Sequence, residues 1–188
     1  MLKPPPKFSG RQFYEEVIAE LSPFHPDAKQ PAPGAADPVR ARLLAYAARA
    51  RELDTILAKL GAKEFCAADC DKLPEGCCWE YAYRIGNEDF FEFLAVQDVE
   101  ARKHGWHRPG SRCRYHSETG CKLSLFKAPV CIRLLCPRLV QALEKRFGRG
   151  ARDFNDALAK LSLDIQRSPT LLGEMDHAIA LGRKLLAQ

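Results

Sequence analysis

The stretch DPVRARLLAYAARARELDTILAKLG (residues 37–61) decides the fold. Asp37 followed by Pro38 is typical of an N-cap and a first helical residue, and Gly61 is typical of a helix end. Between them, apolar residues recur at helical spacing: Val39, Leu43, Leu44, Leu53, Ile56, Leu57 and Leu60. We therefore predict one long helix with an apolar stripe, which leads the chain to Cys66.

The sequence before this helix predicts a short helix followed by a proline-rich linker. RQFYEEVIAEL (11–21) places its apolar residues on one face of a short helix, and the segment up to residue 38 is rich in proline, which is typical of a linker. We expect residues 1–37 to form this short helix and linker. Residues 38–188 are then a single helical domain that contains a cysteine cluster region at 66–136.

The sequence after the first cysteines predicts little sheet. WEYAYRI (79–85) alternates as a half-buried strand does, KLSLF (122–126) could pair with it, and a helix is expected from Asn87 to Gly105. Further helices are predicted from Pro137 to Gly148, at 151–167 and at 169–187. The expected fold is mainly α, with helices packed around an irregular cysteine-rich metal-binding centre and at most a short two-stranded β element.

Composition sets the class of protein. The chain has 188 residues, 46% hydrophobic and 28% charged, with a formal charge of +5, all ordinary for a globular protein. It has no apolar run of signal-peptide or membrane-span length, so we expect a cytoplasmic protein that does not enter a membrane. Positive charge gathers in RKHGWHRPGSRCRYH (102–116), which could balance thiolates or bind an acidic partner.

Eight cysteines are the most informative residues. They form two sets along the chain: Cys66, Cys70, Cys77 and Cys78, then Cys113, Cys121, Cys131 and Cys136. A reducing compartment makes metal binding their leading use, although a disulfide scaffold stays open on number alone. Four thiolates can hold a zinc ion or an iron–sulfur cluster, so the ligand count does not choose the metal. The adjacent pair Cys77–Cys78 makes an ordinary zinc ribbon a poor match.

Three cysteine segments resemble the YkgJ-type cysteine cluster (CxxCxxCC) family of zinc- or iron-chelating domains. They are GCC at 76–78 with the two preceding cysteines, CRYHSETGC at 113–121 and CKLSLFKAPVC at 121–131. Six residues rather than two separate Cys70 from Cys77, and Lys127, Ala128 and Pro129 stand where the family usually has Arg-Pro. The resemblance implies metal binding without a defined reaction. A related motif in the flagellin lysine methylases, associated there with an iron–sulfur cluster, suggests an enzyme by analogy.

Other residues near the second set could contribute to a metal site. His104, His107 and His116 could replace a cysteine as ligand or orient one, or they could be turn histidines in a basic loop. Cys136 directly precedes Pro137, so we expect it at the N-cap of the next helix, where backbone amides and the helix dipole stabilise thiolate.

These observations predict a metal-binding protein with zinc or iron as cofactor, held by the eight cysteines, in an accessory or metal-handling role. An iron–sulfur enzyme is the first alternative, so the sequence leaves catalysis open. A zinc-organised module that binds nucleic acid or protein is the second. A metal ion is the expected partner, a protein partner stays open, and nucleic acid is the least favoured.

Overall fold

The computed structural model describes residues 38–69, 113, 115–117, 119–123, 127–165 and 167–188. Within these ranges it contains six helices and one two-stranded sheet, which confirms a mainly α fold. The helices expected at 11–21 and 87–105, the Pro-rich linker and the strand expected at 79–85 lie outside these ranges.

Helix α2 (Pro38–Lys59) is the central element and has the bounds that the sequence predicts. Its end is followed by Gly61, whose φ of 87° lies in the left-handed region that favours glycine. A second helix, α3 (Ala62–Asp69), begins immediately after this turn and carries Cys66. The sequence did not predict α3, because the eight residues from Ala62 to Asp69 are too short to show helical periodicity.

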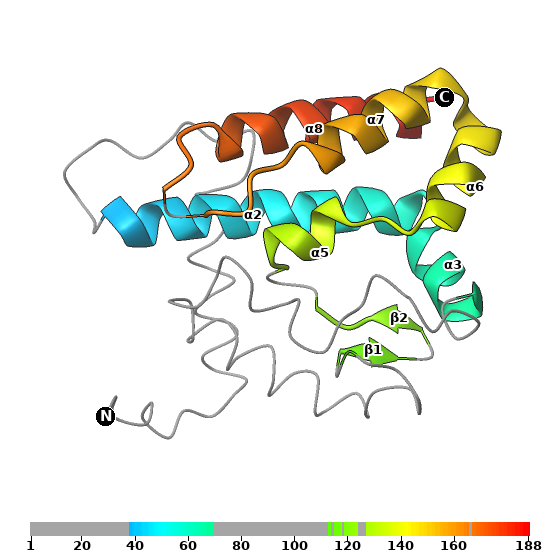
Figure 1. The fold of residues 1–188 in the computed structure, drawn as a ribbon, viewed down its shortest axis with the longest axis horizontal. Helices are drawn as coiled ribbons and strands as arrows, with labels where there is room; N and C mark the ends of the chain where they lie inside the picture. The colour runs from blue at the N-terminus through cyan, green and yellow to red at the C-terminus, as the bar shows by residue number, and fades with distance from the viewer. Residues whose placement is uncertain (1–37, 70–112, 114, 118, 124–126, 166) are drawn as a thin grey trace.

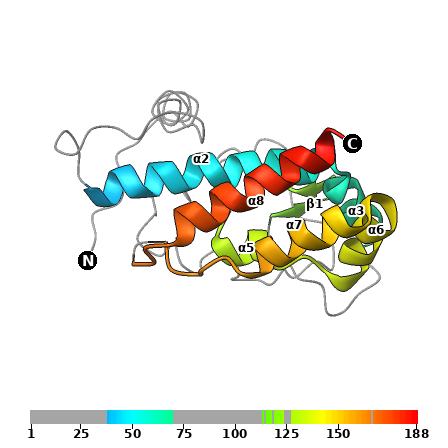
Figure 2. The same ribbon diagram turned by 90° about the horizontal axis from the view of Figure 1, so that it is seen from above.

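The other helices lie on two sides of α2 (Figure 1). Helices α7 (Arg149–Ala159) and α8 (Leu171–Leu186) run along one side, and α8 packs directly on α2, as Figure 2 shows from above. The short helix α5 (Pro129–Arg133) lies beside α2 and contacts α7, and the two-stranded sheet lies on the side of α2 away from α8. Helix α6 (Pro137–Phe147) lies with α3 near the C-terminal end of α2.

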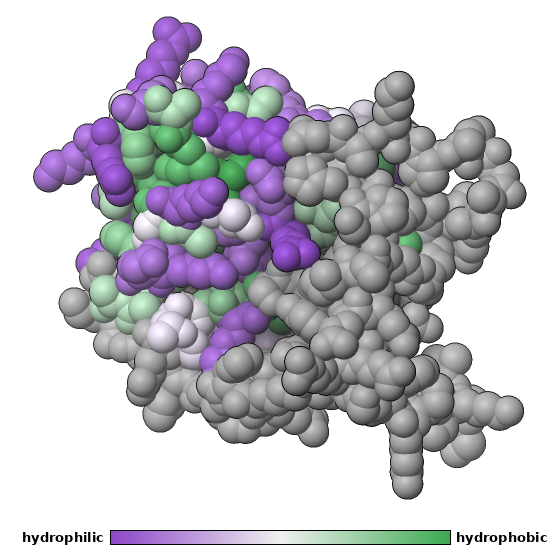
Figure 3. Space-filling view, turned by 180° about the vertical axis from the view of Figure 1, so that it is seen from behind, coloured by the Kyte–Doolittle hydropathy of each residue, from purple (hydrophilic) through white to green (hydrophobic). Residues whose placement is uncertain are grey.

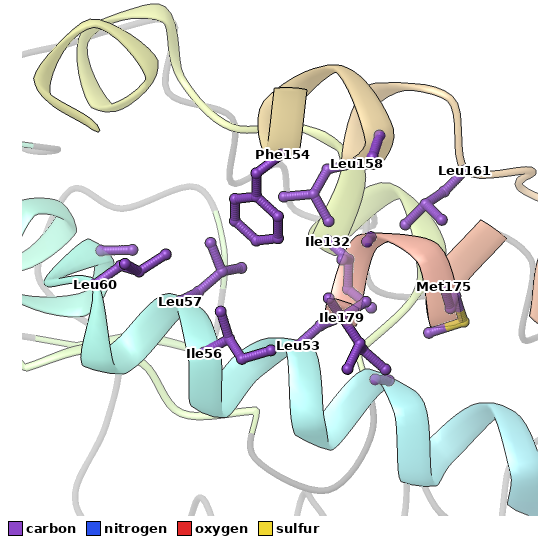
Figure 4. Packing of buried hydrophobic residues seen from close by; sticks show 14 of the residues in the cluster. Leu53, Ile56, Leu57, Leu60, Ile132, Phe154, Leu158, Leu161, Met175 and Ile179 are labelled. Atoms are coloured by element: carbon purple, nitrogen blue, oxygen red, sulfur yellow. The ribbon is translucent and has the colours of Figure 1, made fainter. Parts of the chain in front are cut away.

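The main core fills the space between α2, α7 and α8. Leu53, Ile56 and Leu57 of α2 point toward Phe154 and Leu158 of α7 in Figure 4, and Ile132, Met175 and Ile179 complete the contact. Each of these side chains is at least nine-tenths buried. Burial of one such side chain contributes roughly 1.5–3 kcal/mol, so this apolar contact is the main source of stability in the helical layer.

The helix predicted at 151–167 is shorter in the structure, because α7 ends at Ala159. Beyond Ala159, side-chain carboxylates accept hydrogen bonds from backbone N–H groups. Ser162 N donates to Glu174 Oε2 at 2.8 Å, and Arg167 N donates to Asp164 Oδ1 at 2.8 Å. Such side-chain hydrogen bonds compete with helix formation. The last helix, expected at 169–187, is α8, and the expected helix after Pro137 is α6.

The sheet differs from the expected one. Strand β1 (His116–Ser117) pairs antiparallel with β2 (Gly120–Cys121), in the register His116 to Cys121 and Ser117 to Gly120. Lys122 and Leu123 lie outside both strands, so the start of the strand predicted at 122–126 is wrong. Gly120 explains the shift, since its φ of 93° permits a tight turn that residues with a Cβ rarely adopt.

The surface of the described residues is mostly polar. In Figure 3 hydrophilic side chains project over the described part of the face opposite to that in Figure 1, with smaller apolar areas between them. Only Leu134, Leu163 and Leu186 are exposed large apolar residues in the part of the chain that the structure describes. Within that part, no helix has the length and apolar content needed to cross a membrane.

The close approach of α8 to α2 gives a stability prediction. A Cβ at Gly182 would lie 2.6 Å from Ile56 Cγ2 and 3.0 Å from Phe154 Cε2, both in the packed core. Overpacking of this kind costs about 1–3 kcal/mol, more than the gain of up to about 1 kcal/mol from replacing a helical glycine. Gly182→Ala is therefore expected to lower the free energy of unfolding measured by urea denaturation.

Gly173→Ala is the matched control on the same helix. A Cβ there meets no atom within 4 Å, so this variant should gain about 0.4–1 kcal/mol. An equal gain in both variants would show that α8 does not approach α2 as closely as described.

Candidate metal centre

The structure describes five of the eight cysteines: Cys66, Cys113, Cys121, Cys131 and Cys136. No disulfide joins these five to one another. Cys70, Cys77 and Cys78, the remaining predicted ligands, lie outside the described residues, as do His104 and His107.

Three of the described cysteines share one small apolar cluster. Cys113 is buried beside Tyr115 and Leu123, and the half-buried Cys121 and Cys131 pack against the same group. Cys113 precedes the hairpin, Cys121 ends β2 and Cys131 belongs to α5. The fold thus gathers three thiols from three different local structures.

The hairpin places His116 beside Cys121. These two residues are cross-strand partners, and such pairs project to the same face of a sheet with Cβ atoms about 4.5–5.5 Å apart. His116 is 3% exposed, and its backbone N donates to Cys113 O at 3.0 Å. Of the three histidines predicted to assist a ligand, His116 therefore stands next to a candidate cysteine.

The other two described cysteines pack against the main core. Cys66 lies on α3, and Cys136 is the N-cap of α6, where its Sγ accepts a hydrogen bond from Leu139 N at 3.4 Å. The N-cap position confirms the sequence prediction. Within the second set, Cys136 packs against the main core, whereas Cys113, Cys121 and Cys131 pack against the smaller cluster.

The described residues do not form a complete metal site. Among them, no three histidine, cysteine, aspartate or glutamate side chains come together closely enough to hold an ion. Cys113, Cys121 and Cys131 therefore share an apolar cluster but do not by themselves form a three-ligand site.

A buried charged cluster lies beside these thiols. Asp54 of α2 has a side chain that is 7% exposed and contacts two ammonium groups. Its Oδ2 lies 2.9 Å from Nζ of Lys63 on α3, and its Oδ1 contacts Nζ of Lys127, just before α5. Charged side chains are almost never this buried without a partner, so one carboxylate fixes three separate segments to each other.

Tyr46 adds a second connection between α2 and the same segment. Its hydroxyl donates to the backbone oxygen of Lys127 from a side chain that is fully buried. Burial and the nearby Cys131 raise the pKa of Tyr46 well above its ordinary value. The phenol therefore stays protonated and acts as a donor.

Lys127 is a buried cation that contacts the carboxylate of Asp54 and is close enough to Cys121 and Cys131 for both to influence its pKa. Burial by itself lowers the pKa of Lys127, but Cys121, Asp54 and Cys131 together raise it above the ordinary value for lysine. An opposite charge nearby favours the charged form of a group. Lys127 thus stays a protonated ammonium.

The sequence did not identify Asp54, Lys63, Lys127 or Tyr46 as part of the site. One feature of the sequence did indicate a buried ion pair. Asp54 follows Leu53 within the apolar stripe of the long helix, where a buried charge needs a partner. Its partners could not be found, because Lys127 is far away along the chain and ion pairing leaves no periodic pattern.

A separate hollow of about 790 Å³ lies between α6 and α7 and has mixed charge. Lys145, Arg149 and Arg152 line it together with Glu144 and Asp153. Arg152 pairs with Glu144 at 3.3 Å and Arg149 lies 4.0 Å from Asp153. The paired charges leave this hollow without the uniform positive field that binds nucleic acid.

The buried position of Asp54 gives a second prediction. Asp54→Asn removes the carboxylate and leaves the Lys127 ammonium buried beside a neutral amide, a change that typically costs about 3–5 kcal/mol. Chemical denaturation should show this loss. The double variant Asp54→Asn, Lys127→Met removes both charges and should recover a large part of it.

Glu52→Gln is the control on the same helix. Glu52 pairs with Arg183 at 3.3 Å on the exposed surface, and such pairs contribute less than about 1 kcal/mol. A loss in Asp54→Asn no larger than in Glu52→Gln would contradict the buried ion cluster.

In comparisons with known proteins, no family model, no curated protein and no solved structure matches the chain.

Proposed function

We propose that this chain is a metal-binding protein that holds zinc or iron through cysteine thiolates, with iron present as an iron–sulfur cluster, in an accessory or metal-handling role. The observation that carries the proposal is the apolar cluster on which Cys113, Cys121 and Cys131 pack, three thiols that come from three separate segments. The buried ammonium of Lys127 is compatible with thiolates, which are the ligand form of cysteine.

The ligands would come from both sets of cysteines. Cys113, Cys121 and Cys131 pack on the same apolar cluster, and Cys121 and Cys131 are near enough to Lys127 to influence its pKa. The remaining ligands would be found among Cys70, Cys77 and Cys78. Cys66 and Cys136, on the main core, would complete this centre or belong to a second one.

A bound metal would give this region a structural cross-link, since zinc binding to thiolates contributes about 10–16 kcal/mol of apparent free energy in small zinc domains. Residues of the chain perform the other tasks. Asp54 holds Lys127 in place, Tyr46 fixes the backbone before α5, and Leu139 N donates to the sulfur of Cys136.

An iron–sulfur enzyme and a zinc-organised module that binds protein or nucleic acid are the alternatives. The mixed charge of the hollow between α6 and α7 does not favour nucleic acid. The two metals differ in colour, so one preparation distinguishes them. Anaerobic purification with elemental analysis and an absorbance spectrum should give stoichiometric zinc without colour, or iron and sulfide with visible absorbance.

Substitution of single thiols tests the proposed ligands. Cys121→Ser and Cys131→Ser should each lower the metal content of the purified protein by at least about tenfold, because serine is a poor ligand for zinc or iron–sulfur clusters at neutral pH. Elemental analysis after gel filtration provides the measurement.

Ala128→Ser is a control that adds a hydroxyl to the same neighbourhood without removing a thiol. Ala128 is fully buried and is the N-cap residue of α5, where serine is favoured. Full metal content in Cys121→Ser and Cys131→Ser, or wild-type protein purified anaerobically without metal, would contradict the proposed function.

A further inference from the structure

We propose that the hollow between α6 and α7 is an interaction surface for an acidic segment of a partner protein, whose carboxylates contact Lys145, Arg149 and Arg152. The hollow lies where α6 ends and α7 begins. None of the residues that line it is a proposed metal ligand, so this surface is independent of the metal centre.

Positive charge is concentrated around the turn that joins the two helices. Residues 137–153 contain five arginine and lysine residues and two acidic residues, which gives this segment a net charge of +3. The whole chain has a formal charge of +5, so this short segment supplies more than half of it. A local excess of positive charge attracts anionic partners and speeds their association.

The ion pairs inside the hollow are weak. Arg152 lies 3.3 Å from Glu144, and Arg149 lies 4.0 Å from Asp153. The two arginine side chains are 67% and 92% exposed, and ion pairs this exposed contribute less than about 1 kcal/mol. Carboxylates of a partner can therefore compete for both guanidinium groups at little cost.

Lys145 supplies a third positive charge to the hollow. In the described part of the chain no carboxylate pairs with Lys145, which is exposed in the last turn of α6. The helix dipole favours a cation there by about 0.3–1 kcal/mol and leaves the ammonium available for a closer contact. Three cations and the two carboxylates of Glu144 and Asp153 thus give the hollow one positive charge that a partner can neutralise.

The two carboxylates decide which kind of polyanion fits. Glu144 and Asp153 lie among the cations, so a nucleic acid, which has a phosphate at every nucleotide, would meet repulsion as well as attraction. A polypeptide can place neutral residues or backbone N–H groups opposite these carboxylates and its own carboxylates opposite the cations. The pattern of charge therefore favours a protein segment.

The shape of the hollow also suits a protein segment. Its volume of about 790 Å³ accommodates several side chains, whereas a single inorganic anion would leave most of it empty. Gly148 contributes no side chain to fill it, and a Cβ there would meet no atom within 4 Å. The side-chain amide of Gln141 can donate to and accept from the backbone of a bound peptide.

Binding of an acidic peptide tests the proposal. The probe is a fluorescently labelled peptide in which glutamate alternates with glycine, and fluorescence anisotropy at low ionic strength measures its affinity for the full chain. The double variant Lys145→Gln, Arg149→Gln should weaken binding by about 4–25-fold, because each exposed ion pair contributes about 2–5-fold and separate pairs add. Added salt should weaken binding to the unmodified protein.

Arg138→Gln, Arg146→Gln is the matched control. It removes two positive charges from exposed positions on α6 that do not line the hollow. A contact with the hollow predicts a change of less than about twofold in this variant, because exposed charges at a distance are screened.

A single-stranded oligothymidylate of the same formal charge is the second probe, and it should bind more weakly than the peptide. Failure of the peptide to bind at low ionic strength, tighter binding of the oligothymidylate, or equal losses in the two double variants would each overturn the proposal. These measurements need no bound metal, so their failure leaves the proposed metal-binding function unaffected.

Discussion

The carboxylate of Asp54 is the constraint on which the cysteine-bearing half of the structure depends. It lies on α2 inside the protein, and its two partners come from different segments, Lys63 on α3 and Lys127 before α5. Burial of a charge is costly unless it is paired, so the three segments have few other arrangements that keep all charges compensated. This contact helps to position β2, which packs on α3, and α5, which Ile132 and the Tyr46 hydroxyl also hold against the rest of the protein.

Helix α2 thus uses two kinds of interaction on its two sides. Toward α7 and α8 it packs apolar side chains, a contact whose energy depends on area and tolerates many residue types. Toward the cysteines it offers Tyr46 and Asp54, which have specific partners and little freedom to change them. The apolar side stabilises the helical layer, and the polar side determines where Cys121 and Cys131 stand.

Local sequence patterns predicted the helix boundaries that are set by residues close to them in the chain. Pro38 and Gly61 mark α2, and Cys136 with Pro137 marks the start of α6, because caps and breakers act within a few residues. The end of α7 could not be predicted, since it depends on the Glu174 side chain twelve residues beyond Ser162. For the site, spacing predicted the cysteines as a group, but it could not reveal that Cys131 and Cys136 pack against different clusters or that Asp54 contacts Lys127.

If the proposed metal centre forms near Lys127, the charge on Lys127 would have different consequences for the two metals. For zinc, a cation beside the thiolates withdraws electron density from sulfur and lowers its reactivity, which suits a structural ion. For an iron–sulfur cluster, the same cation stabilises the more negative, reduced state and so raises the reduction potential. Lys127 would be compatible with either proposed centre, because thiolate ligands bring negative charge to both. In the zinc case it would stabilise the site, and in the iron–sulfur case it would also set the potential at which the cluster exchanges electrons.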